Sequence, residues 1–99
     1  MNKTIKKISG KVTVADYIVT FISNILSVKD VFMVTGAAIM HLTDGVARNK
    51  NLRAICVHHE QTASMALEAY ARANENFGVG FFSTGPGATN AITGLGGAW

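Results

Sequence analysis

Apolar positions occur along the chain in two patterns, which predict alternating helices and strands. In residues 14–26 they recur every three to four positions, the spacing of one helix face, at Val14, Tyr17, Ile18, Phe21, Ile22 and Ile25. Just before them, Thr13-Val14-Ala15-Asp16 has the spacing of a capping box and predicts where this helix starts. Weaker helical patterns follow at residues 39–49 and 62–74.

Short continuous apolar runs predict three strands. They are "DVFMV" at residues 30–34, "RAICV" at 53–57 and "GVGFFS" at 78–83. Runs of this kind are typical of strands buried on both faces, so Cys56 is expected to be a small core residue. The segment "TGPGATN" then reads as a loop that opens a fourth helix at about Asn90.

This order of elements predicts an α/β fold. Helices that alternate with buried strands form a parallel sheet with helices on both faces. The last helical pattern reaches Trp99 without a glycine cap, a basic last turn or a proline. We therefore expect a truncated domain.

Composition limits the number of domains and the class of protein. A chain of 99 residues, 48% hydrophobic and with one proline, can form one small packed domain. The net charge of +3 comes from the lysines of a basic tail at residues 1–11, and residues 12–99 are nearly balanced in charge. We therefore expect no nucleic-acid partner and, with no apolar run of about 20 residues, no membrane partner. The single cysteine fits a reducing, cytoplasmic location.

Three loops follow the predicted strands at the sheet edge where parallel α/β proteins bind ligands. They are "TGAA", "HHEQ" and "TGPGATN". Glu60 lies in the second loop, near a helix start, where it is either a partner of the helix dipole or a functional carboxylate. The glycines match neither a dinucleotide fingerprint nor a P-loop, and Ala63 stands where a zinc-protease motif needs its second histidine. No metal site is predicted.

Taken together, "VFMVTGAA", "HHEQTASMALEAYARA" and "STGPGATNAITGL" resemble the N-terminal pyrimidine-binding domain of thiamine-diphosphate enzymes, in particular the acetolactate synthase group. The resemblance covers residues 12–99 and implies a Rossmann-like three-layer fold, here partial. It also implies that Glu60 is the catalytic glutamate that hydrogen-bonds the aminopyrimidine of the cofactor and favours its imino tautomer. The implied cofactor-binding residues are Gly36, Glu60, Gly85, Pro86, Gly87 and Asn90.

The reaction implied by this resemblance begins with decarboxylation of a 2-keto acid, most plausibly pyruvate. The two-carbon unit then passes to an acceptor carbonyl. Thr35-Gly36-Ala37 replaces the usual Pro-Gly-Gly, which leaves the acceptor open between a second pyruvate and a nucleotide-linked keto sugar. Alternatives are a related decarboxylase or oxidase, and a non-catalytic module that keeps only the fold and a subunit-interaction surface.

The family's second half-site is absent from this sequence. Related enzymes hold the diphosphate and Mg²⁺ through a Gly-Asp-Gly…Asn motif in another domain, and "TDGVARN" does not fit it. The resemblance therefore implies a homodimer or tetramer in which another subunit supplies that domain. It leaves FAD open as a further cofactor, and it predicts that these 99 residues alone are inactive.

Overall fold

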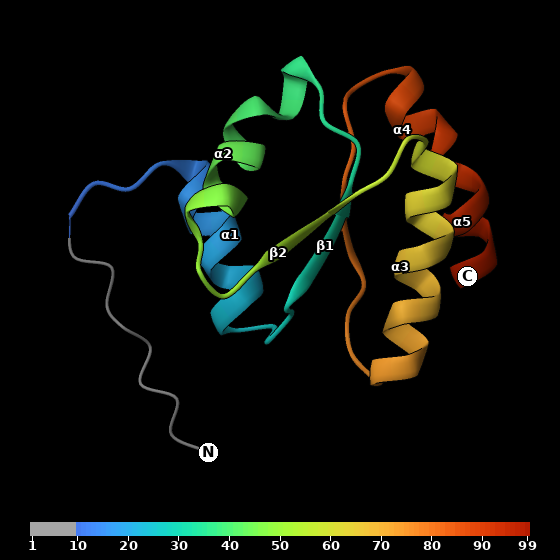
Figure 1. Ribbon diagram of the computed structural model, residues 1–99, viewed down its shortest axis with the longest axis horizontal. Helices are drawn as coiled ribbons and strands as arrows, with labels where there is room; N and C mark the ends of the chain where they lie inside the picture. Colours follow the sequence, from blue (N-terminus) through green and yellow to red (C-terminus); the bar gives the residue numbers. More distant parts are fainter. Residues whose placement is uncertain (1–9) are drawn as a thin grey trace.

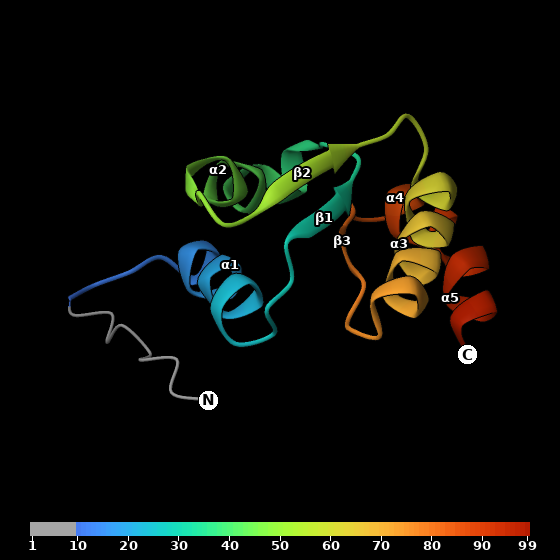
Figure 2. The same ribbon diagram turned by 60° about the horizontal axis from the view of Figure 1, so that its bottom comes forward.

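Three short parallel strands form the centre of the structure, a computed structural model that describes residues 10–99. They are β1 (Asp30–Met33), β2 (Arg53–Cys56) and β3 (Val79–Phe81), in the order β2-β1-β3. Figure 1 labels β1 and β2, and Figure 2 labels all three strands. β1 lies in the middle, with Asp30 opposite Arg53 of β2 and Val31 opposite Val79 of β3. The predicted parallel sheet is confirmed.

Helices cover both faces of this sheet, as predicted. One side carries α1 (Val14–Asn24) and α2 (Met40–Arg48), which follows the 3₁₀ turn η1 (Ala37–Ile39). The other side carries α3 (Glu60–Asn74), α4 (Pro86–Asn90) and α5 (Ile92–Ala98) (Figure 2). The fold is therefore a three-layer α/β arrangement.

The start of α1 is fixed by the predicted cap. Thr13 Oγ1 accepts a hydrogen bond from the Asp16 amide at 3.1 Å and donates one to Asp16 Oδ2 at 2.8 Å. Arg48 of α2 pairs with Asp16 Oδ1 at 2.6 Å. Asp16 is thus bonded both to the N-cap of α1 and to Arg48 of α2, and it ties the two helices together.

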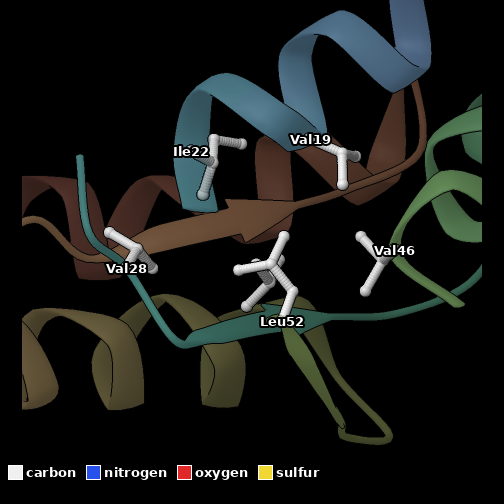
Figure 3. Close-up of a cluster of buried hydrophobic side chains, with 6 residues drawn as sticks. Val19, Ile22, Val28, Val46 and Leu52 are labelled. Carbon is white, nitrogen blue, oxygen red and sulfur yellow. The ribbon is translucent and has the colours of Figure 1, made fainter. Parts of the chain in front are cut away.

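The main core lies between the sheet and the pair α1 and α2. The buried side chains that meet there belong to Val19, Ile22, Val28, Val31, Val46 and Leu52. Figure 3 labels all of them except Val31. The helix face predicted for α1 is wrong, because five of its six apolar residues are 37–76% exposed: Val14, Tyr17, Ile18, Phe21 and Ile25. α1 is apolar on more than one face, so its periodicity could not show that Val19 would be buried.

Three further predictions are corrected by the structure. β2 is an edge strand with the side chains of Arg53, Ala54 and Cys56 exposed, and within residues 10–99 it pairs with β1 alone. α3 begins two residues earlier than predicted, at Glu60. The segment "TGPGATN" holds α4, which starts at Pro86, a residue well suited to a first helical turn.

Within residues 10–99, no helix has the length and apolar character needed to cross a membrane.

Candidate functional site

Glu60 occupies the first position of α3, and three residues separate it from the end of β2. His59 is the N-cap, and its Nδ1 accepts a hydrogen bond from the Gln61 amide at 3.0 Å. The cap fixes the turn from strand to helix at the carboxyl end of the sheet. The Glu60 side chain is therefore held at the ligand-binding edge and remains partly exposed.

The second residue of the site comes from a distant part of the chain. Asn90, at the end of α4, donates a hydrogen bond from Nδ2 to Glu60 Oε2 at 3.1 Å. The sequence predicted that both residues bind the cofactor but not that they contact each other. The structure brings "HHEQ" and "GPGATN" together through this bond.

The start of α4 lies beside the other carboxylate oxygen. Gly85 has φ +65° and ψ −121°, a conformation that favours glycine, and Pro86 follows as the first residue of α4. Gly87 is buried, and a Cβ built on it would lie 3.3 Å from Glu60 Oε1. Glycine at position 87 therefore leaves space beside the carboxylate.

Gly36 allows the loops after β1 and β3 to approach each other. A Cβ on Gly36 would lie 2.8 Å from both Cβ and Oγ of Ser83, and Ser83 Cβ lies 3.5 Å from a Cβ built on Gly87. All three strand-end loops thus converge on one site. Sequence reasoning missed Ser83, although its place at the end of the third apolar run was a usable signal.

The charge of Glu60 is stabilised by its surroundings. The hydrogen bond from Asn90 is the largest cause of a lowered Glu60 pKa, followed by a backbone hydrogen bond at Glu60 itself. Desolvation works in the opposite direction and is outweighed. At neutral pH the site therefore presents an ionised carboxylate that can accept hydrogen bonds but not donate them.

Metal ligands do not gather at this site. In the part of the chain that the structure describes, no three His, Cys, Asp or Glu side chains lie where they could hold a metal ion together. The arrangement is suited to binding a ring N–H through one carboxylate, with backbone close to the ligand.

Comparison with known proteins gives a family match and several relatives. The family model described as "Thiamine pyrophosphate enzyme, N-terminal TPP binding domain" matches residues 12–99. An acetolactate synthase large subunit from Cyanidium caldarium is 41% identical over 71 residues, 69% of this chain and 12% of that protein. An acetolactate synthase from Mycobacterium avium is 40% identical over 70 residues, 71% of this chain and 11% of that protein. The chain thus spans about a tenth of these relatives' length.

Proposed function

Because the chain belongs to the thiamine pyrophosphate enzyme family, as its N-terminal cofactor-binding domain, we propose that Glu60 is the catalytic carboxylate of an enzyme of acetolactate synthase type. The observation that carries this proposal is the setting of the Glu60 carboxylate. One of its oxygens is held by Asn90 and the other lies beside Gly87, where a Cβ is absent.

These residues fit the aminopyrimidine of thiamine diphosphate. A flat ring with an N–H at its edge needs an ionised acceptor for that N–H. It also needs a stretch of backbone without bulky side chains, which the ring can approach closely. Glu60 supplies the acceptor, and the turn from Gly85 to Gly87, with Pro86 between them, supplies the access. Gly36 lies on the neighbouring loop, so it would line the same pocket rather than touch the reacting atoms.

When bound, the cofactor supplies the carbon nucleophile that attacks a 2-keto acid and the electron sink needed when carbon dioxide leaves. The role of Glu60 would be to accept a hydrogen bond from the ring N–H with its carboxylate and so to keep the proton on that nitrogen. Asn90 lowers the pKa of that carboxylate and orients it, because its amide donates a hydrogen bond to one oxygen. A carboxylate fixed in this way needs little reorganisation when charge develops on the ring.

The names of the relatives bear on the substrate. Those from Cyanidium caldarium and Mycobacterium avium carry the name acetolactate synthase, which supports pyruvate as the 2-keto acid and as one candidate acceptor. We propose a nucleotide-linked keto sugar as the other candidate acceptor. We propose that Mg²⁺ and the diphosphate are held by a further domain, contributed by another subunit of a cytoplasmic homo-oligomer.

Replacement of Glu60 in the full-length protein tests the proposal. Glu60→Gln keeps the shape but removes the charge, so we expect product formation from pyruvate to fall about 10²-fold or more. Glu68→Gln, two turns further along α3 and paired with Arg72, is the matched control and should keep near-normal activity. Turnover of Glu60→Gln within a few-fold of the wild type would contradict the assignment.

A further inference from the structure

A hollow of about 490 Å³ opens at the amino ends of β1 and β2, at the sheet edge opposite to Glu60. Its floor includes the buried side chains of Val28 and Leu52. Its polar lining comes from the end of α1, from the loops before both strands and from the first residue of each strand: Ser23, Ser27, Lys29, Asp30, Lys50, Asn51 and Arg53. None of these residues belongs to the site around Glu60.

Arg53 is held in this hollow by a buried carboxylate. Asp30, only 7% exposed, accepts a hydrogen bond from Arg53 Nε at 2.6 Å and another from the Tyr70 hydroxyl at 2.7 Å. Within residues 10–99, Asp30 is the only hydrogen-bond partner of the Arg53 guanidinium. The guanidinium donates to it through Nε alone. The two terminal nitrogens of an oriented, 74% exposed side chain therefore remain available to a ligand.

The lining has an excess of positive charge. Lys29, Lys50 and Arg53 carry three positive charges against one negative charge on Asp30. The pKa of Asp30 is lowered, first by the hydrogen bond from Arg53, so this carboxylate is ionised at neutral pH. Neither lysine forms an ion pair with any residue from 10 to 99. The net charge of the lining is therefore +2, and the lysines are free to meet a ligand.

We propose that this hollow binds a small dianionic ligand through a phosphoryl group. A phosphoryl group matches the fork of the Arg53 guanidinium, which can bind two of its oxygens at once. Lys29 and Lys50 supply the remaining positive charge, and Asn51 and Ser23 supply polar groups at the rim. The volume is in the range of small-molecule sites. Because the hollow and Glu60 lie at opposite ends of the strands, this ligand is distinct from the cofactor and would bind alongside it.

Inorganic phosphate is a suitable probe. We would titrate it into the full-length protein by calorimetry, at constant ionic strength and with thiamine diphosphate and Mg²⁺ present to occupy any diphosphate site. One phosphate should bind per chain, and acetate, with a single charge, should bind more weakly. Lys29→Gln and Lys50→Gln should each weaken phosphate about two- to five-fold, the effect of one exposed ion pair. Lys11 is an exposed lysine outside the hollow, so Lys11→Gln should leave the affinity for phosphate unchanged.

Arg53→Lys tests the geometry of the guanidinium separately from its positive charge. It keeps the positive charge near Asp30 but loses bidentate binding, so phosphate affinity should fall while the melting temperature stays close to the wild type. The proposal is overturned if phosphate does not bind at millimolar concentration, or if Lys29→Gln and Lys50→Gln bind it like Lys11→Gln. Equal affinity for acetate and phosphate would also overturn it.

Discussion

Among the side chains of residues 10–99, Asn90 lowers the pKa of Glu60 the most. Its amide is the first cause of the lowered Glu60 pKa, and it reaches the carboxylate from a residue thirty positions away. A carboxylate that must stay ionised to accept a ring N–H benefits directly from such a donor. Asn90 is therefore expected to act on the reaction through Glu60.

Asn90→Ala should move the pH dependence of catalysis. Without the amide donor, the pKa of Glu60 rises towards the ordinary carboxyl range, so the carboxylate becomes protonated at higher pH. The acid limb of the kcat/KM profile should therefore shift to higher pH, with a smaller loss of activity at neutral pH than in Glu60→Gln. The measurement is kcat/KM for pyruvate across the acid range.

Asn74→Ala is the matched control for this prediction. Asn74 ends α3, where its amide donates to the Tyr70 carbonyl at 2.8 Å, far from the carboxylate. Its profile should coincide with that of the wild type. An unshifted acid limb in Asn90→Ala would show that the hydrogen bond to Glu60 does not set the charge that catalysis needs.

At the scale of elements, α3 and α5 pack through a glycine. A Cβ on the buried Gly94 would lie 2.2 Å from Ser64 Oγ and 2.5 Å from the Ser64 carbonyl carbon. The backbone of α3 cannot move aside as a flexible side chain could. Helices α3 and α5 are therefore as close as they are because position 94 has no side chain.

Gly94→Ala should destabilise the protein although alanine is the better helix former. Forcing a methyl group into this contact should cost about 1–3 kcal/mol of unfolding free energy. Gly96→Ala, in the same helix with nothing within 4 Å of the added Cβ, should be neutral or stabilising by up to about 1 kcal/mol. Thermal melts of the two variants compare them directly. Equal melting temperatures would mean that the two helices are further apart than described.

At the scale of the whole molecule, one buried carboxylate connects three elements. Asp30 of β1 binds Arg53 of β2 and the hydroxyl of Tyr70 from α3, and the Tyr70 ring packs edge-on against Phe32, with ring centroids 5.5 Å apart. These contacts join the sheet to the helical layer that does not contain α1. The same carboxylate orients Arg53 in the hollow described above.

Asp30→Asn should lower stability in a pH-dependent way. The pKa of Asp30 is lowered in the folded protein, so its stabilising effect is complete above the pKa of the unfolded chain and is lost as pH falls through the folded value. We expect Asp30→Asn to cost about 1–3 kcal/mol at neutral pH, the scale for hydrogen bonds to a charged group. The difference from the wild type should shrink in acid, below about pH 4.

Denaturant unfolding at a series of pH values measures this effect. Asp44→Asn removes an exposed carboxylate that pairs with Arg48 within α2, and it should change stability by less than about 1 kcal/mol at any pH. A gap between Asp30→Asn and the wild type that stays constant down to strong acid would show that the charge of Asp30 is not what stabilises the fold.

The sequence alone determined the features that depend on near neighbours. The helix cap of Thr13 and Asp16, the alternation of helices with parallel strands, and the place of Glu60 after the second strand all follow from patterns a few residues long. Short-range periodicity and capping fix these features because they involve contacts within one or two turns. The family-like blocks made Glu60 identifiable for the same reason, since each block is continuous in sequence.

Only the tertiary structure decided which surfaces meet. In the folded protein Val19 of α1 is buried, whereas Phe21, on the helix face predicted to be buried, is exposed. β2 lies at the edge of the sheet, and Cys56 is exposed. The hydrogen bonds from Asn90 to Glu60 and from Tyr70 to Asp30 join residues 30 and 40 positions apart. Such contacts depend on strand order and on the side of the sheet that each helix covers. These are properties of the whole packed chain, and no local pattern in the sequence encodes them.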